Sequence, residues 1–125
     1  MRLFYLIALL FISTGVFSQS AKIDSLQNIL KTQREDTNKV NTLLAISKIY
    51  YLIPDFDKAL VYAKSSLLLS EKLNFKRGEA SALARMGWIH SNRYSYAEAF
   101  NYFYKALDLR EELGEKQFAA NMLES

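Results

Sequence analysis

His90 is the only histidine of this 125-residue chain, and the chain contains no cysteine. A Ser-His-Asp triad would therefore have to be built around His90, and thiolate catalysis, disulfides and cysteine-ligated metal sites are excluded. Acidic neighbours such as Glu111 and Glu112 diverge on a helix and suit a solvated surface. Gly78 and Gly87 are isolated, so they form no glycine-rich phosphate loop. We expect no enzymatic activity, no cofactor and no metal.

A run of aromatic residues in the second half of the chain would suit stacking against nucleic-acid bases. The run comprises Tyr94, Tyr96, Phe100, Tyr102, Phe103 and Tyr104. Its spacing spreads the rings around a helix, with only Arg93 and Lys105 nearby, and this favours packing in the core and on the helix surface instead. The 16 basic and 13 acidic residues give a net charge of +3, with no more than two basic residues in a row. Nucleic acid is therefore not an expected partner.

The composition predicts one small helical domain. Half of the residues are apolar, and the chain has four glycines and one proline. The apolar content excludes disordered and collagen-like classes, and the scarcity of glycine and proline favours long helices.

The segment Met1–Ser18 has the pattern of a secretory signal peptide. Arg2 provides a positive charge, an uninterrupted apolar run follows from Leu3 to Ile12, and Val16 and Ser18 precede a cleavage position before Gln19. The apolar run of about 15 residues is shorter than the roughly 20 that a membrane-spanning helix needs. We therefore expect an exported protein, periplasmic or otherwise extracytoplasmic. An uncleaved membrane anchor and a buried core helix are the alternatives.

The chain contains an internal repeat, in which positions 41–78 align with positions 81–118. Nine of these 38 aligned pairs are identical, whereas ordinary composition gives about two or three. The identities include Leu43/Leu83 and Ala59/Ala99, and Leu123 continues the first series. We predict a lead-in helix within 19–35, repeats at 36–75 and 76–115, and the start of an incomplete third repeat at 116–125.

Each repeat is predicted to form two antiparallel helices. Hydrophobic spacing and turn residues place the helices at 37–52, 56–72, 76–91 and 96–112. Asp36 and Asp55 are expected to cap the first two helices, and Ser95 with Glu98 has the pattern of a capping box.

Special positions also recur between the repeats. Asn74 and Gly114 follow the second helices, where a left-handed backbone is expected. Ser47 and Gly87 are expected where the paired helices approach most closely, because only a small side chain fits there.

These features resemble the tetratricopeptide repeat (TPR) family in a 40-residue variant, from about residue 36 to residue 125. The family's small, aromatic and apolar positions fall in the first repeat on Leu43, Ile46, Ser47, Tyr50, Phe56, Ala59, Ala63 and Ser66. In the second repeat they fall on Leu83, Met86, Gly87, His90, Tyr96, Ala99, Phe103 and Ala106. His90 replaces an inter-helix aromatic residue, so we interpret it as a packing residue. The resemblance implies an all-α, right-handed α-solenoid of antiparallel helix pairs.

In this family the first helices of the repeats line a concave face that binds a protein or a peptide. By register, the residues that point into this groove are Asn41, Leu44, Lys48, Tyr51, Leu52, Ser81, Ala84, Trp88, Ser91 and Asn92. Trp88, beside Tyr51 and Asn92, is expected to anchor an extended or helical peptide. Alternatively, Trp88 packs against the neighbouring repeat or covers apolar surface left by missing repeats.

The segment before residue 40 resembles the start of secreted TPR regions in sensor proteins of Bacteroidetes-like bacteria. The resemblance implies an exported binding scaffold that is the signal-receiving part of a longer sensor. The alternatives are a non-catalytic N-terminal fragment of a membrane histidine kinase or DNA-binding regulator, and a stand-alone periplasmic adaptor. Membrane contact is expected only through the signal segment or a downstream helix. Apolar surface on the last helix, with Phe100 and Phe103, is expected to be covered by further repeats or by self-association.

Overall fold

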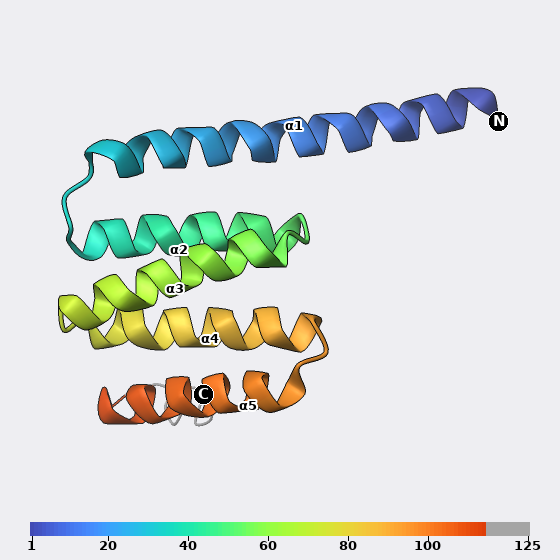
Figure 1. Ribbon diagram of the computed structural model, residues 1–125. Coiled ribbons are helices and arrows are strands. Elements are labelled where there is room, and N and C mark those ends of the chain that lie inside the picture. Colours follow the sequence, from blue (N-terminus) through green and yellow to red (C-terminus); the bar gives the residue numbers. More distant parts are fainter. Residues whose placement is uncertain (115–125) are drawn as a thin grey trace, which may run out of the picture. The chain divides into compact units, whose positions relative to one another are not determined.

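The computed structural model describes residues 1–114, apart from the side chains of residues 10–17. The described residues form five α-helices with short connections and no other regular secondary structure, which confirms the all-α class (Figure 1). They fall into two units, residues 1–33 and the chain from residue 34 onward, and each unit is described by itself. The predicted start of a third repeat, 116–125, lies outside the described residues.

The first unit is a single helix, α1 (Arg2–Thr32), which ends at Gln33 in extended backbone. This helix continues without a break through the predicted cleavage position before Gln19 and contains most of the predicted lead-in helix. Leu3, Phe4 and Tyr5 near its start are exposed. Within the described residues, no helix combines the length and the apolar character that crossing a membrane requires.

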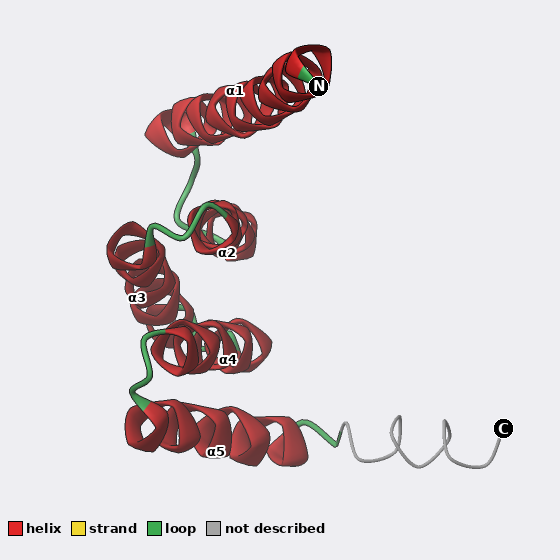
Figure 2. Cartoon of the chain, turned by 90° about the vertical axis from the view of Figure 1, so that its right-hand side faces the viewer, coloured by secondary structure: helices red, strands yellow, loops and turns green. Residues whose placement is uncertain are grey.

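The second unit contains four helices in two consecutive pairs. They are α2 (Thr37–Leu52), α3 (Phe56–Lys72), α4 (Lys76–Asn92) and α5 (Tyr96–Glu112), and their bounds agree closely with the predicted ones. Each helix packs on the next, and α2 also contacts α4. Figure 2 shows α2 and α4 on one side of this unit with α3 on the other. The first helices of the two pairs therefore form one continuous surface.

Two aspartates cap helices of the first pair as predicted. The Asp36 carboxylate accepts a hydrogen bond from the Lys39 backbone N–H at 3.1 Å, and the Asp55 carboxylate accepts one from the Lys58 N–H at 3.3 Å. Each bond satisfies one of the backbone donors that the start of a helix leaves unpaired.

The capping box predicted at Ser95 and Glu98 is wrong, because the Ser95 side chain makes no capping hydrogen bond. Ser95 has almost the same backbone as Asp55, with φ −91° and ψ 67° against φ −96° and ψ 76°. With these backbone angles, the carboxylate of Asp55 reaches its backbone donor at 3.3 Å, near the upper limit for a hydrogen bond. The shorter side chain of Ser95 therefore does not reach the equivalent donor. The Ser95 N–H already donates to the His90 carbonyl at 2.9 Å, which leaves Glu98 no capping donor.

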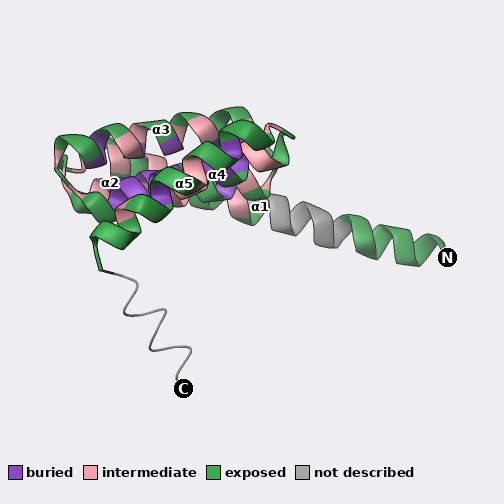
Figure 3. Ribbon diagram, turned by 90° about the horizontal axis from the view of Figure 1, so that it is seen from below, coloured by how far each residue is buried: buried purple, intermediate pink, exposed green. Residues whose placement is uncertain are grey.

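The paired helices meet at small residues. The Ser47 hydroxyl of α2 donates a hydrogen bond to the Ala59 carbonyl of α3 at 2.8 Å, and both residues are fully buried. At the equivalent position of α4, Gly87 lies under the Phe103 ring of α5, and a Cβ there would come within 2.7 Å of that ring. Figure 3 shows that buried stretches, in purple, alternate with exposed ones along the helices of this unit. The predicted close approach is therefore present in both pairs.

A ring stack also recurs at equivalent positions of the two pairs. Tyr50 stacks on Tyr62 with ring centroids 5.7 Å apart, and His90 stacks on Tyr102 at 5.2 Å. His90 thus takes the packing position expected for it, between α4 and α5.

The outward side of α5 is apolar and uncovered in the described part of the chain. Tyr96, Phe100, Tyr104 and Leu107 are all exposed, and their spacing of three and four positions places them on one side of the helix. Other members of the aromatic run pack as expected: Tyr102 contacts His90, Phe103 contacts Trp88, and Tyr94 contacts Tyr96. Phe103 was also expected on this side, but it is half-buried because it turns toward the space above Gly87.

The predicted left-handed residues are confirmed, and a third is present. Asn74 and Gly114 have φ of 52° and 73°, and Tyr94, which was not predicted, has φ of 60°. At Tyr94 the end of α4 is closed by backbone bonds from Tyr94 to Ser91 (3.1 Å) and from Ser95 to His90 (2.9 Å). An aromatic residue in this conformation costs about 1 kcal/mol.

Replacing Gly87 by Ala is expected to destabilise the protein by about 1 kcal/mol. The added methyl group must displace the Phe103 ring, and overpacking of about 1–3 kcal/mol exceeds the helix-propensity gain of up to about 1 kcal/mol. Chemical denaturation monitored by circular dichroism measures the change. In the double variant with Phe103→Leu the penalty from Gly87→Ala is expected to shrink. An equal penalty with either residue at position 103 would contradict the close approach.

Replacing Tyr94 by Gly is expected to leave the protein more stable than replacing it by Ala, by about 1 kcal/mol. Both variants lose the same ring contact with Tyr96, so their difference isolates the backbone conformation. Thermal melts of the two variants provide the comparison. Equal melting temperatures would show that residue 94 does not adopt a positive φ.

Candidate functional site

The predicted groove residues all lie on α2 and α4, and none of them is buried. Asn41, Lys48, Leu52, Trp88 and Asn92 are exposed. The half-buried members are Leu44, Tyr51, Ser81, Ala84 and Ser91. Because α2 and α4 are in contact, these residues share one surface of the second unit.

Hydrogen bonds connect three of these residues near the ends of α2 and α4. The Asn92 side-chain amide donates to the Tyr51 hydroxyl at 2.7 Å and to the Trp88 carbonyl at 3.0 Å. Tyr51 lies on α2 and the other two on α4, so the amide ties the two first helices together. The Tyr51 ring is supported in turn by Phe56, with centroids 5.9 Å apart.

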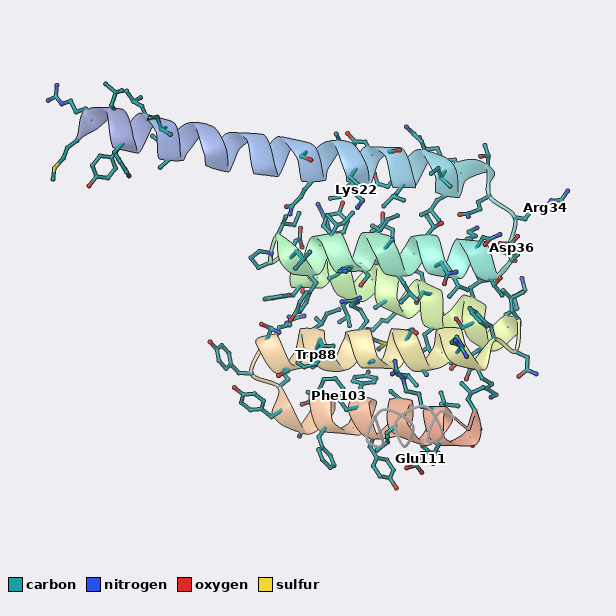
Figure 4. All side chains as sticks on the ribbon, turned by 180° about the vertical axis from the view of Figure 1, so that it is seen from behind. Lys22, Arg34, Asp36, Trp88, Phe103 and Glu111 are labelled. Atoms are coloured by element: carbon teal, nitrogen blue, oxygen red, sulfur yellow. The ribbon has the colours of Figure 1, made fainter. Side chains whose placement is uncertain are left out.

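Trp88 is both packed and accessible. Its ring meets Phe103 edge-on, with centroids 5.1 Å apart and an angle of 74°, and 53% of the residue remains exposed. Figure 4 shows Trp88 on α4 and Phe103 on the facing side of α5. This contact between α4 and α5 restricts the indole ring of Trp88, and about half of the residue stays free to contact another molecule.

Arg85 belongs to this cluster and was missed by the sequence analysis. Its guanidinium carbon lies 6.0 Å from the centre of the Tyr51 ring. The side chain is half-buried, and its Nε atom is buried without a hydrogen-bond partner. Burial lowers the pKa of Arg85 below its usual value, and interaction with Tyr51 opposes this change. The family register does not assign its position to the groove, yet its spacing from Trp88 and Asn92 by three and seven positions places it on their side of α4.

We define the first-helix face as Lys48, Tyr51, Arg85, Trp88 and Asn92. It carries the charged and aromatic side chains of the surface. The other predicted residues lie on the same two helices and, within the described part of the chain, their side chains make no hydrogen bond or ion pair with this cluster. They are Asn41, Leu44, Leu52, Ser81, Ala84 and Ser91.

Two hollows elsewhere on the second unit contain none of the predicted residues. One, of about 430 Å³, is lined by Pro54, Asp55, Phe56, Asp57 and Arg93, and the last two form an ion pair at 3.1 Å. The other, of about 410 Å³, lies between α2 and α3 and is lined in part by Glu35 and Lys72. A hydrogen bond from Lys72, at 2.6 Å, lowers the pKa of Glu35.

The residues that the structure describes contain no cluster of three His, Asp or Glu side chains placed to hold a metal ion. The first-helix face offers aromatic and amide contacts to another molecule, because it contains the half-exposed Trp88 and the Tyr51 hydroxyl that is bonded to a side-chain amide. Such a surface suits recognition of another molecule.

The second unit is thus a helical-repeat scaffold, in which the same ring stack and the same close contact recur at equivalent positions of the two helix pairs. Residues 80–113, which comprise most of α4 and all of α5, match the sequence model of the tetratricopeptide repeat family. The match falls within the second predicted repeat and includes three members of the first-helix face. No curated protein shows significant sequence similarity to the chain.

The hydrogen bond between Tyr51 and Asn92 is expected to couple α2 to α4. In a double-mutant cycle of Tyr51→Phe and Asn92→Ala, we expect a coupling energy of about 0.5–1 kcal/mol, because the bond is accessible to solvent. Urea denaturation of the four proteins measures it. Additive effects of the two substitutions would contradict the contact.

Proposed function

We propose that the first-helix face binds a segment of another protein or a peptide. The observation that carries this proposal is the state of Trp88, which Phe103 holds edge-on while about half of the residue stays exposed. Tryptophan, tyrosine and arginine are the residues that most often dominate binding energy at protein interfaces, and all three gather on this face. The repeat match at residues 80–113 suggests protein–protein interaction in general.

Preorganisation also supports binding at this face. Asn92 holds the Tyr51 hydroxyl, and the Phe103 ring restricts the indole of Trp88. Side chains that are already ordered lose little conformational entropy when a partner arrives, so more of the contact energy appears as affinity.

A bound peptide is proposed to pass from α4 to α2 over these side chains. Its apolar residues would contact the free part of the Trp88 ring. Its backbone would donate to the Asn92 side-chain oxygen, since both amide N–H groups of Asn92 are already used, and would accept from the Lys48 ammonium. The predicted residues nearer the starts of the helices, such as Ser81 and Ala84, are small and leave room for the chain of the ligand.

We further propose that the protein acts outside the cytoplasm, as the signal-receiving part of a longer sensor. The support is the basic and apolar pattern of the segment 1–18 and the similarity of the segment before residue 40 to secreted sensor regions. A stand-alone periplasmic adaptor is the competing role. Mass spectrometry of the protein from the native cell envelope tests export: Gln19 is expected at the N-terminus, and an intact Met1 in the cytoplasmic fraction would contradict it.

Trp88→Ala is expected to weaken peptide binding by at least about tenfold, because tryptophan anchors of this kind contribute about 2 kcal/mol or more. Peptides that bind the full chain are first selected from a displayed peptide library, and their affinities for each variant are then measured by titration. Phe100→Ala, which removes an exposed ring from the far side of α5, is the matched control and is expected to have no effect.

Asn92→Ala is a second variant for this test, because it leaves the packing between Trp88 and Phe103 in place. Circular dichroism confirms that each variant is folded. Binding that is lost in Phe100→Ala and kept in Trp88→Ala and Asn92→Ala would move the site to α5 and refute the proposal.

A further inference from the structure

We propose that residues 116–125 cover the C-terminal half of the apolar side of α5, as the first turns of a helix that packs on α5 in the way that α4 packs on α3. The occupant of this side is thus a segment of the chain itself, which lies outside the described residues. The proposal goes beyond the proposed function of the first-helix face. It is carried by a comparison of α3 with α5 and by the residue pattern of the segment.

The apolar side of α5 corresponds to the side of α3 that α4 covers. In the 40-residue register the aligned pairs are Phe56/Tyr96, Leu60/Phe100 and Leu67/Leu107. The three residues of α3 are half-buried, whereas the three of α5 are exposed. Because α3 packs on both α2 and α4, while α5 packs closely only on α4 in the described part of the chain, α5 lacks one neighbouring helix. Tyr104 aligns with the exposed Lys64, so we do not expect it to be covered.

The chain leaves α5 through the same turn by which it leaves α3. Asn74 and Gly114 follow the two helices with φ of 52° and 73°. In each turn the N–H of this left-handed residue donates to the carbonyl three positions earlier, at 3.1 Å and 3.0 Å. The turn at Asn74 returns the chain along α3 as α4, so we expect the turn at Gly114 to return it along α5.

The residue pattern of the segment matches the burial pattern at the start of α4. Within residues 76–85 of α4, five residues are buried and five are half-buried or exposed. The residues aligned with the five buried positions are all apolar, and they are Phe118, Ala119, Ala120, Met122 and Leu123. The residues aligned with the other five are all polar, and they are Lys116, Gln117, Asn121, Glu124 and Ser125. The segment therefore has the single apolar side that a helix needs to pack on another helix.

One difference between the two repeats is compensated within the segment. In the connection before α4, the Phe75 ring lies against Gly78, where a Cβ would come within 2.5 Å of the ring. The segment has Phe118 at the position of this glycine, and Glu115 stands at the position of the phenylalanine. One aromatic ring is therefore available at this junction in both repeats, from the connection in one and from the helix in the other.

The length of the segment limits how much of α5 it covers. Ten residues of helix span about 15 Å, whereas the 17 residues of α5 span about 26 Å. The start of α4 lies beside the end of α3, because only three residues connect them (Figure 1). The segment in the same arrangement covers α5 from its C-terminal end to slightly beyond its middle. Leu107 lies within this range, and Phe100, two turns nearer the start of α5, lies outside it.

Thiol labelling of the full chain measures this cover, because the chain has no cysteine of its own. Leu107→Cys and Phe100→Cys place one thiol inside and one outside the proposed cover, on the same side of α5. The labelling rate of each variant is divided by its rate in urea. We expect Leu107→Cys to react at least about tenfold more slowly than Phe100→Cys, because a covered thiol reacts only when the segment opens. Equal normalised rates would overturn the proposal.

Two substitutions in the segment identify what protects the thiol. Leu123→Asp places a charge at a position expected to be buried, and Asn121→Asp, the matched control, places the same charge at a position expected to face away from α5. Combined with Leu107→Cys, the first is expected to raise the labelling rate to that of Phe100→Cys, and the second to leave it unchanged. Circular dichroism verifies the fold of each variant.

Protection of the thiol at position 107 that survives Leu123→Asp would assign the cover to another part of the chain and overturn the proposal. Protection that disappears when the protein is diluted would assign it to a second copy, with the same consequence. Peptide binding does not enter these measurements, so their outcome is independent of the proposed function of the first-helix face.

Discussion

The close contact between the paired helices is the constraint on which the rest of the second unit depends. In the first pair, the buried Ser47 hydroxyl of α2 donates a hydrogen bond to the Ala59 carbonyl of α3. In the second pair, Gly87 has no side chain, and the Phe103 ring occupies the space instead. A larger residue at either position would separate the helices. The same contact that holds α5 against α4 places Phe103 beside Trp88, so the packing of the pair also fixes the most prominent side chain of the binding face.

The sequence was sufficient for features that depend on local spacing. The caps at Asp36 and Asp55, the left-handed Asn74 and Gly114, and the four paired helices follow from residue type and hydrophobic period. Ser95 and Tyr94 were not predictable in the same way, because their roles are decided by the backbone angles of the connection between α4 and α5. At those angles a serine hydroxyl is too short to cap, and the Ser95 N–H is already bonded to His90.

The candidate site was predictable only in part, for a different physical reason. The register of the repeat placed Tyr51, Trp88 and Asn92 on one surface. It could not show that the side-chain amide of Asn92, on α4, donates a hydrogen bond to the hydroxyl of Tyr51, on α2. Arg85 was missed because its position is outside the groove in that register, and spacing does not reveal its contact with the Tyr51 ring. Phe103 was assigned to the exposed side of α5, and it turned inward because Gly87 leaves room for its ring.

The central claim is that the ligand lies on the first-helix face and contacts Trp88. The most direct test is a nitrogen–proton NMR titration of the full chain with a peptide selected on it. We expect the Trp88 indole N–H and the Asn92 side-chain amide signals to shift together, while the backbone signals of Phe100 and Tyr104 stay in place. Shifts confined to Phe100 and Tyr104, with Trp88 and Asn92 unchanged, would contradict this claim.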